Sequence, residues 1–374
     1  MSAPDRPNDA IWIEAGLLDP SAPHADERRE LLAFLTEQGL TLATMVEACE
    51  QQQLVTVAGD RLLRPGHMFT VDELARRAGM DDLEFVTELR TASGFPPSPP
   101  DEPACTDDDV EMFRLFELAS EVFSRQELLR FVRALGVSMR RIAEAAAEMF
   151  LRDVEATQHV ERATELERAL TNIQAIELGS AATAVFPPMF RAHLVLAIGD
   201  ARRARRHHHD YETTPFTVGF VDLTGFTARA GASSPAELLR LVTWFEATAH
   251  DLVTSHGGRL VKLIGDEVMF ATVEPDQGCS IALALTRIAD MPARGGLAHG
   301  QVVTSGGDLY GPVVNLASRI ADVAIPGEVL VDQAVVDAVR TDPHVTIEID
   351  VEPAGRRQLK GFAEPVRLWS ISER

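Results

Sequence analysis

The sequence predicts an α+β protein in which an all-helical N-terminal domain precedes an α/β domain. Apolar residues recur at helical spacing between residues 25 and 198, whereas after residue 215 short β-branched runs closed by turn residues alternate with helical patterns. The second part follows the order βαββαβ, which is the order of a ferredoxin-like α/β sandwich. We therefore expect domains at residues 1–199 and 215–374, joined by a linker at 200–214.

Composition excludes several classes of protein. With 374 residues, a quarter of them charged and 45% apolar, the chain can bury a core, and two or three domains are expected. A formal net charge of −22 argues against a dedicated nucleic-acid binder. Three isolated cysteines fit a reducing cytoplasm. We find neither a signal peptide nor an apolar run of about eighteen residues, so we expect no transmembrane segment and a cytoplasmic protein.

The N-terminal half contains recognisable helix boundaries. A helix from Ala25 should end at Gly39, Thr41 should cap the next helix, and Thr106 with Asp109 should open a long helical region. Residues 189–198 are apolar enough for one buried helix. The apolar helices of this half form either an ordinary core, which we favour, or the wall of a lipid-sized pocket.

A helix-turn-helix-like unit is predicted near residues 68–95. Its second helix carries Asp82, Glu84 and Glu88 but only Arg90 as a cation, so this face would repel phosphates. We expect a helical packing module here and no DNA binding.

The linker contains three adjacent histidines, His207 to His209, which follow four arginines. Adjacent helical residues point in different directions, so one metal ion would not collect all three. The segment is either a solvated linker or a proton sensor, because histidine titrates near neutral pH.

The C-terminal half is predicted element by element. A strand at 216–222, a helix at 235–256, a hairpin at 259–273 with a Gly265-Asp266 turn, a helix at 277–289 and a strand at 295–303 form the sandwich. The tail adds a strand at 328–331, a helix at 333–340 and strands near 345–349, 357–360 and 366–371.

Two acids stand where strands end. Asp222 closes the first strand, ahead of the backbone N–H groups of Gly225, Phe226 and Thr227, and Asp266 lies at the hairpin tip. Asp222 alone could simply cap a helix. Two carboxylates on neighbouring strands, however, suit magnesium, which takes its remaining ligands from phosphates and water.

Three ordered sequence blocks and a final Leu-Lys360-Gly-Phe resemble the signatures of class III nucleotide cyclases, over roughly residues 216–371. The blocks are Phe-Val-Asp222-Leu-Thr-Gly-Phe-Thr, Leu-Val-Lys262-Leu-Ile-Gly-Asp266-Glu and Asp308-Leu-Tyr-Gly-Pro-Val-Val-Asn315-Leu-Ala-Ser-Arg319. Several blocks in the family's order are far more specific than a lone glycine motif.

The resemblance implies an adenylyl cyclase with a role for each matched residue. Asp222 and Asp266 would hold two Mg²⁺ or Mn²⁺ ions in each active site, and Lys262 with Asp308 would select the adenine of ATP. Asn315 would orient the ribose and Arg319 would neutralise charge at the α-phosphate, while Lys360 would reach the terminal phosphates. The sequence departs from the family pattern at Gln301, a position where many members carry a basic residue.

The resemblance also implies a homodimer. In this family the metal carboxylates come from one chain and the purine and transition-state residues from its partner, so two equivalent sites would lie at the interface. The helical half resembles the autoinhibitory, acid-responsive regulatory halves of soluble actinobacterial cyclases, with a proton or a lipid as effector. The alternatives are a DNA-binding regulator and a catalytically silent nucleotide-binding scaffold.

Overall fold

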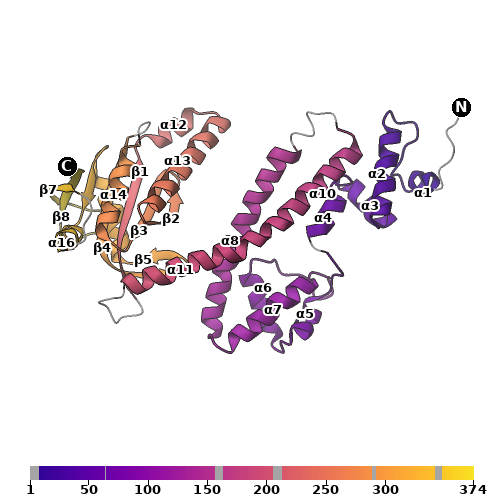
Figure 1. Cartoon of the computed structure of the whole chain (residues 1–374), viewed down its shortest axis with the longest axis horizontal. Coiled ribbons are helices and arrows are strands. Elements are labelled where there is room, and N and C mark those ends of the chain that lie inside the picture. Colours follow the sequence, from indigo (N-terminus) through magenta and orange to yellow (C-terminus); the bar gives the residue numbers. More distant parts are fainter. Residues whose placement is uncertain (1–7, 64, 156–162, 205–212, 289–291, 342–347) are drawn as a thin grey trace. The chain divides into compact units, whose positions relative to one another are not determined.

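The computed structural model describes all residues except 1–7, 64, 156–162, 205–212, 289–291 and 342–347 (Figure 1). The predicted sensor histidines, His207 to His209, lie outside the described residues. The chain divides into two compact units, Met1–Phe190 and Arg191–Arg374.

The first unit is helical, and its elements are α1 (Asp9–Glu14), α2 (Ala25–Glu37), α3 (Leu42–Glu50), α4 (Val57–Leu63), α5 (Val71–Ala78), α6 (Leu83–Ala92), α7 (Asp107–Ser120), α8 (Arg125–Phe150), the π-helix η1 (Leu151–Glu155), α10 (Glu165–Ala182) and the short η2 (Thr183–Val185). Its predicted helix starts are confirmed. The hydroxyl of Thr41 accepts a hydrogen bond from the N–H of Thr44 at 3.2 Å, and Thr106 and Asp109 form a capping box at α7.

The helix-turn-helix-like unit consists of α5 and α6, which are joined at Gly79 in the left-handed conformation (φ 79°). Two of the acidic residues at α6 form ion pairs with a neighbouring helix. Arg125 of α8 forms ion pairs with Asp82 at 3.0 Å and with Glu88 at 2.9 Å. Val86 and Leu89 are fully buried in the cluster that α5, α7 and α8 share. α6 is the helix that would have to contact DNA in a helix-turn-helix protein. Here one face of α6 is packed into the core of the helical unit.

One prediction for the helical half is wrong. Residues 189–198 form the expected helix, within α11 (Phe186–Ala204), but it is not buried. The exposed fractions are 69% for Val195 and 61% for Leu196, because nothing in the described part of the chain covers them.

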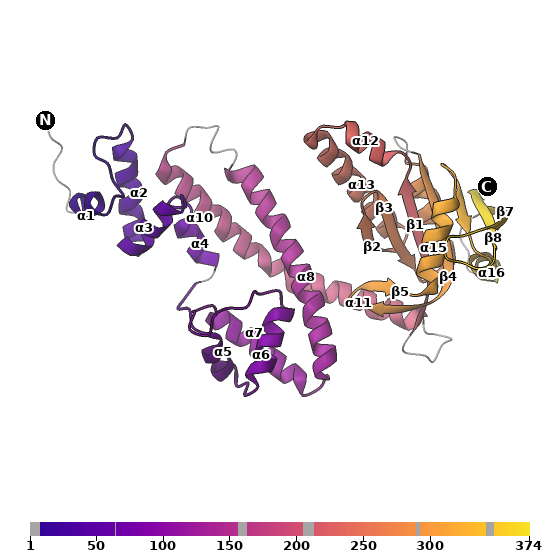
Figure 2. The same ribbon diagram turned by 180° about the vertical axis from the view of Figure 1, so that it is seen from behind.

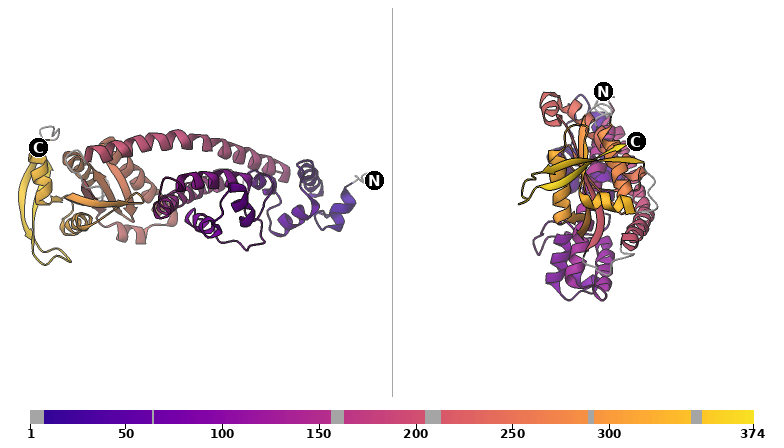
Figure 3. Two further views of the ribbon diagram at one scale, coloured as in Figure 1. Left: turned by 90° about the horizontal axis from the view of Figure 1, so that it is seen from below. Right: turned by 90° about the vertical axis from the view of Figure 1, so that its left-hand side faces the viewer.

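α10, η2 and α11 are continuous from Glu165 to Ala204 (Figure 3), and by length and composition this helix could cross a membrane. Length and composition alone are weak grounds for a membrane span.

The second unit is built around an eight-stranded sheet with the order β2-β3-β1-β4-β6-β8-β7, with β5 paired to β4. Its elements are β1 (Thr214–Leu223), α12 (Phe226–Ala232), α13 (Pro235–Ser255), β2 (Arg259–Ile264), β3 (Glu267–Thr272), α14 (Pro275–Thr286), β4 (Ala293–Ser305), β5 (Asp308–Tyr310), α15 (Pro312–Val323), β6 (Val329–Val331), α16 (Gln333–Thr341), β7 (Ile349–Arg357) and β8 (Val366–Glu373). The α/β architecture predicted from the sequence is confirmed.

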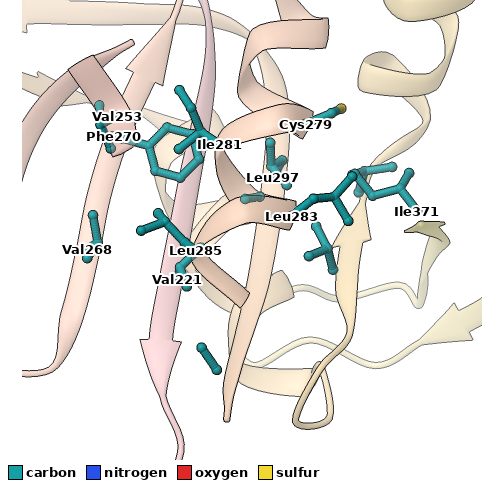
Figure 4. Packing of buried hydrophobic residues seen from close by; sticks show 14 of the residues in the cluster. Val221, Val253, Val268, Phe270, Cys279, Ile281, Leu283, Leu285, Leu297 and Ile371 are labelled. Carbon is teal, nitrogen blue, oxygen red and sulfur yellow. The ribbon is translucent and has the colours of Figure 1, made fainter. Parts of the chain in front are cut away.

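Helices cover both faces of this sheet. α13, α14 and α16 enclose one core, where Val221 and Phe270 of the sheet meet Ile281 of α14 (Figure 4). α15 encloses the other core through Ala317 and Ile320, and it is seen on the reverse side in Figure 2. Burial on both faces explains why β1 reads as a nearly continuous apolar run.

The tail of the sheet differs from the prediction. The strand expected at 357–360 does not form, and a single strand, β7, runs from Ile349 to Arg357 instead. β7 contains Pro353 and Gly355, which it tolerates because it is an edge strand and because the register shifts between these two residues.

Candidate active site

The two predicted metal carboxylates lie on adjacent strands. Asp222 stands near the end of β1, in register with Glu267 of β3, and Asp266 occupies the two-residue turn between β2 and β3. The N–H of Leu223 donates to the carbonyl of Asp266 at 3.2 Å, which ties the turn to the end of β1. The local order strand, turn and hairpin therefore brings residues 44 positions apart in the sequence to one edge of the sheet.

Arg294 of β4 completes this group, and the sequence analysis missed it. It lies directly opposite Asp222 in the β1–β4 ladder. Its Nη2 and Nε donate to Oδ2 of Asp222 at 2.9 and 3.1 Å, and its Nη1 donates to the carbonyl of Asp322 at 2.9 Å. Among the described residues Oδ1 of Asp222 accepts no hydrogen bond, so one carboxylate oxygen stays available.

Negative charge is concentrated here. Burial, followed by the charge of Asp222, raises the pKa of Asp266. Burial raises the pKa of Glu267 to about 7, and the charges of Asp222, Asp322 and Asp266 act in the same direction. Glu267 was also missed, because it sits in the predicted block without an assigned role.

These residues fit a divalent cation. A cation beside Asp222 and Asp266 would favour the ionised form of Asp266, whose pKa burial and, to a lesser extent, the charge of Asp222 raise. Within the described ranges no group of three His, Cys, Asp or Glu side chains is placed to hold a metal. Two carboxylates suit Mg²⁺ or Mn²⁺ only when phosphate oxygens and water supply the other ligands, as they do in nucleotide sites.

The turn after β1 offers hydrogen-bond donors. Gly225 is left-handed (φ 82°) and precedes α12, whose first backbone N–H groups, including those of Phe226 and Thr227, have no partner within the helix. The hydroxyl oxygen of Thr224 is buried and has no hydrogen-bond partner in the part of the chain that the structure describes. An unpaired buried hydroxyl next to free N–H groups fits phosphate oxygens.

Lys262 and Asp308 meet although they are 46 positions apart. Nζ of Lys262, on β2, donates to Oδ2 of Asp308, on β5, at 2.6 Å. Burial pushes the pKa of Asp308 upward, but hydrogen bonds from Lys262 and from the N–H of Leu309 outweigh it, and the net pKa is lowered. The pair therefore presents one cation and one ionised carboxylate side by side.

The remaining predicted residues lie on and after α15. Asn315 and Arg319 are one turn apart on this helix, and Nη1 of Arg319 donates to Asp322 at 2.7 Å. Lys360 is exposed beside the buried Leu359. Gln301, the departure from the family pattern, is exposed on β4.

Residues 209–373, which include the acids of β1 and of the hairpin, the Lys–Asp pair and α15, match the adenylate and guanylate cyclase catalytic domain. The chain therefore belongs to the family of adenylate and guanylate cyclases.

Relatives extend the match beyond that domain. An uncharacterized protein of Mycobacterium tuberculosis is 31% identical over 372 residues, which cover 96% of this chain and 93% of the relative. An adenylate cyclase of Streptomyces coelicolor is 32% identical over 273 residues, covering 71% and 70% of the two chains. A pH-sensitive adenylate cyclase of Mycobacterium tuberculosis is 36% identical over 160 residues, covering 41% and 40%.

Proposed function

We propose that the protein is an adenylate cyclase that converts ATP to 3′,5′-cyclic AMP and pyrophosphate. The ribose 3′-oxygen forms a bond to the α-phosphorus, and the bond from that phosphorus to the bridging oxygen breaks, so pyrophosphate leaves. Little covalent chemistry falls to the protein in such a transfer, and positioning with charge stabilisation supplies most of the catalysis.

The observation that carries the choice of ATP is the contact between Lys262 and Asp308 at 2.6 Å. A cation donates to N1 of adenine, and a carboxylate accepts from its exocyclic amine. Guanine presents the opposite polarity at both positions and would leave both groups unpaired. The names of the Streptomyces relative and of the pH-sensitive relative support the same substrate.

Each residue of the site has a role in this reaction. Mg²⁺ or Mn²⁺ ions, held by Asp222 and Asp266, would lower the pKa of the 3′-hydroxyl and stabilise charge on the phosphates. Asn315 orients the ribose, and Arg319 balances the charge that develops at the α-phosphate. Lys360 binds the terminal phosphates, together with the backbone N–H groups at Gly225, Phe226 and Thr227.

The working enzyme is a homodimer in this proposal, with each site assembled from two chains. The uncovered apolar side chains of α11 support it: Leu194, Val195 and Leu196 are 44%, 69% and 61% exposed. Such a surface is unusual on a water-soluble monomer. We place a second copy there rather than a bilayer, because a dimer is what the family's shared sites require.

Exchanging the polarity of the purine pair tests the proposed substrate. The wild-type protein should form cyclic AMP from MnATP and should use GTP poorly. Lys262→Glu combined with Asp308→Cys should lower kcat/KM for ATP by at least about thirtyfold, because two mispaired polar groups cost roughly 1–3 kcal/mol each.

Asp350→Asn, on the edge strand β7, is the control and should leave both rates unchanged. An unchanged rate of ATP cyclisation in the double variant would show that Lys262 and Asp308 do not read the base. A wild-type protein that binds ATP but forms no product would instead be a silent scaffold.

We further propose that the helical half restrains the cyclase half and that acid releases this restraint. The name of the pH-sensitive relative supports a proton effector, and histidine is the side chain that titrates in the relevant range. The full-length chain should be several-fold more active near pH 6 than near pH 8, and a fragment from Tyr211 onward should show a weaker dependence. Equal pH profiles for the two proteins would point to a lipid effector instead.

A further inference from the structure

Asp322 lies three residues after Arg319 on α15 and belongs to none of the sequence motifs. Nη1 of Arg319 donates to Oδ2 of Asp322 at 2.7 Å, and among the described residues the side chain of Arg319 forms no other hydrogen bond. A guanidinium carries five N–H donors in a fixed fork, so most of them stay available for a second partner such as a phosphate. The contact therefore orients the side chain of Arg319 without saturating it.

Helix stability does not explain this pair. The cation stands on the N-terminal side of the acid, which is the less favourable orientation for an ion pair on a helix. Asp322 also lies in the last turn of α15, where a negative charge opposes the helix dipole. The side chains of Arg319 and Asp322 are 39% and 49% exposed, and an exposed pair adds little to folding. An effect on Arg319 accounts for the acid better than an effect on folding does.

The backbone of Asp322 is fixed from the sheet. Its carbonyl is one of the last four of α15, which receive no hydrogen bond within the helix. Nη1 of Arg294, on β4, donates to this carbonyl at 2.9 Å, while Nε and Nη2 of Arg294 donate to Asp222. A chain of hydrogen bonds therefore runs from Asp222 on β1 to Arg319 on α15. Asp322 contributes both its carbonyl and its carboxylate to this chain.

We propose that Asp322 is a positioning residue that holds the guanidinium of Arg319 in the orientation that meets the α-phosphate. This rests on the proposed function, in which Arg319 balances charge that develops in the transition state. A long arginine side chain has many rotamers, and fixing one of them before the substrate binds removes an entropic cost from the catalytic step. Asp322 acts on kcat through Arg319 and does not itself touch the nucleotide.

Asp322→Asn tests the proposal, because it removes the charge and keeps the size of the side chain. We expect kcat for cyclic AMP formation to fall about tenfold and KM for ATP to change by less than about twofold, since the lost contact matters in the transition state. Asp322→Glu keeps a carboxylate within reach of Arg319 and should retain at least about half of the wild-type kcat.

Asp350→Asn is the matched control. The side chain of Asp350 is also 49% exposed and also pairs with an arginine, Arg374, but it lies on the edge strand β7. This variant should keep the wild-type kcat. A loss of kcat in Asp350→Asn equal to that in Asp322→Asn would overturn the proposal, because removal of any exposed acid would then have the same effect.

Thermal unfolding separates positioning from a structural role. Removing the negative charge from the last turn of α15 should leave Tm unchanged or slightly raised, because the charge no longer opposes the helix dipole. The expected result for Asp322→Asn is therefore a lower kcat at an equal or higher Tm. A lower kcat accompanied by a clearly lower Tm would identify Asp322 as a structural residue and would overturn the proposal.

A double-mutant cycle shows whether Asp322 acts through Arg319. The charge of Asp322 also helps to raise the pKa of Glu267, beside the metal acids, so an effect on the metal site has to be distinguished. In an Arg319→Ala background, assayed at high enzyme concentration, Asp322→Asn should cause no further loss of kcat. A further loss of about tenfold in that background would mean that the acid acts elsewhere, and would overturn the proposal.

Two outcomes separate this proposal from the proposed function. If the wild-type chain forms cyclic AMP and Asp322→Asn keeps the wild-type kcat, the positioning role is wrong and the cyclase activity stands. If the wild-type chain binds ATP but forms no cyclic AMP, both are wrong. Equal losses of kcat in Asp322→Asn and Asp322→Glu would also overturn the positioning role, because a carboxylate at this position would not be what the reaction requires.

Discussion

Asp332 is a buried carboxylate outside the active site that couples the stability of the cyclase unit to pH. It is 8% exposed, and its Oδ1 accepts from the N–H of Val335 at 2.9 Å at the start of α16. Burial raises its pKa from 3.8 to about 6, although N–H groups of Val335 and His299 oppose the shift. The folded chain therefore binds this proton more tightly than the unfolded chain. The resulting stabilisation is complete below about pH 4 and is lost as the pH rises through about 6.

Asp332→Asn should remove this dependence. The amide keeps the cap on α16 but carries no charge to bury, so the free energy of unfolding at pH 7.5 should rise by on the order of 1–3 kcal/mol. Urea unfolding of both proteins at pH 4.5 and 7.5 measures the effect, and the gain over wild type should be larger at pH 7.5. Asp350→Asn serves as control, because Asp350 is half exposed and its pairing with Arg374 lies near the protein surface. A variant that is equally destabilised at both pH values would show that Asp332 does not titrate in this range.

At the residue scale, the residues of the sequence motifs could be predicted, whereas the residues that contact them from outside the motifs could not. Lys262 and Asp308 were paired from sequence, and the structure places them in contact. Arg294 donates to Asp222 just as Lys262 donates to Asp308, yet no sequence motif contains Arg294. Its place depends on the register between β1 and β4, and a shift of one residue would turn it to the other face of the sheet.

At the element scale, β4 packs closely against α15, which carries Asn315 and Arg319. Gly296 makes this approach possible. A Cβ built there would lie 2.2 Å from the nitrogen of Ala321 and 2.6 Å from the carbonyl oxygen of Ala317, both backbone atoms of α15. The absence of a side chain at position 296 therefore allows the helix with the proposed catalytic pair to lie directly against the sheet.

Gly296→Ala should push α15 away from the sheet. We expect the free energy of unfolding to fall by about 1–3 kcal/mol, and kcat to fall further than stability alone explains, because Asn315 and Arg319 move with the helix. Gly295→Ala is the matched control on the opposite face, where a Cβ would meet only valine methyls at 3.4 Å. Denaturant unfolding and cyclase assays measure both effects. Wild-type behaviour of Gly296→Ala would contradict this close packing.

Helices, strands and turns could be predicted where a few adjacent residues determine the structure, but not where contacts with distant parts of the chain determine it. The hairpin at Gly265 and the cap at Thr41 depend on a few adjacent residues, and both formed as expected. β7 contains Pro353 and Gly355, which only its edge position tolerates. The helix at 189–198 was expected to be buried because it is apolar, but burial also requires a partner surface, which a single sequence does not reveal.

At the scale of the whole molecule, the proposed shared sites make the dimer a catalytic requirement. In a closed two-fold dimer, each site takes Asp222 and Asp266 from one chain and Lys262, Asp308, Asn315 and Arg319 from the other. A defect in either set removes one contribution to both sites of a mutant homodimer. In a mixed dimer, two different defects lie in the same site only if one affects the metal carboxylates and the other affects the residues that the partner chain contributes.

Asp222→Ala and Asn315→Ala chains should each be inactive alone and should regain activity when they are co-expressed. In the mixed dimer both defects meet in one site, and the other site is intact. Dimers purified through two different tags should therefore show about half of the wild-type activity, and an unselected mixture about a quarter. Asp222→Ala with Asp266→Ala is the matched control. Each of its two sites then receives one defective metal carboxylate, and no activity should return. No recovery by tagged, demonstrably mixed dimers of the first pair would mean that each chain assembles its site alone.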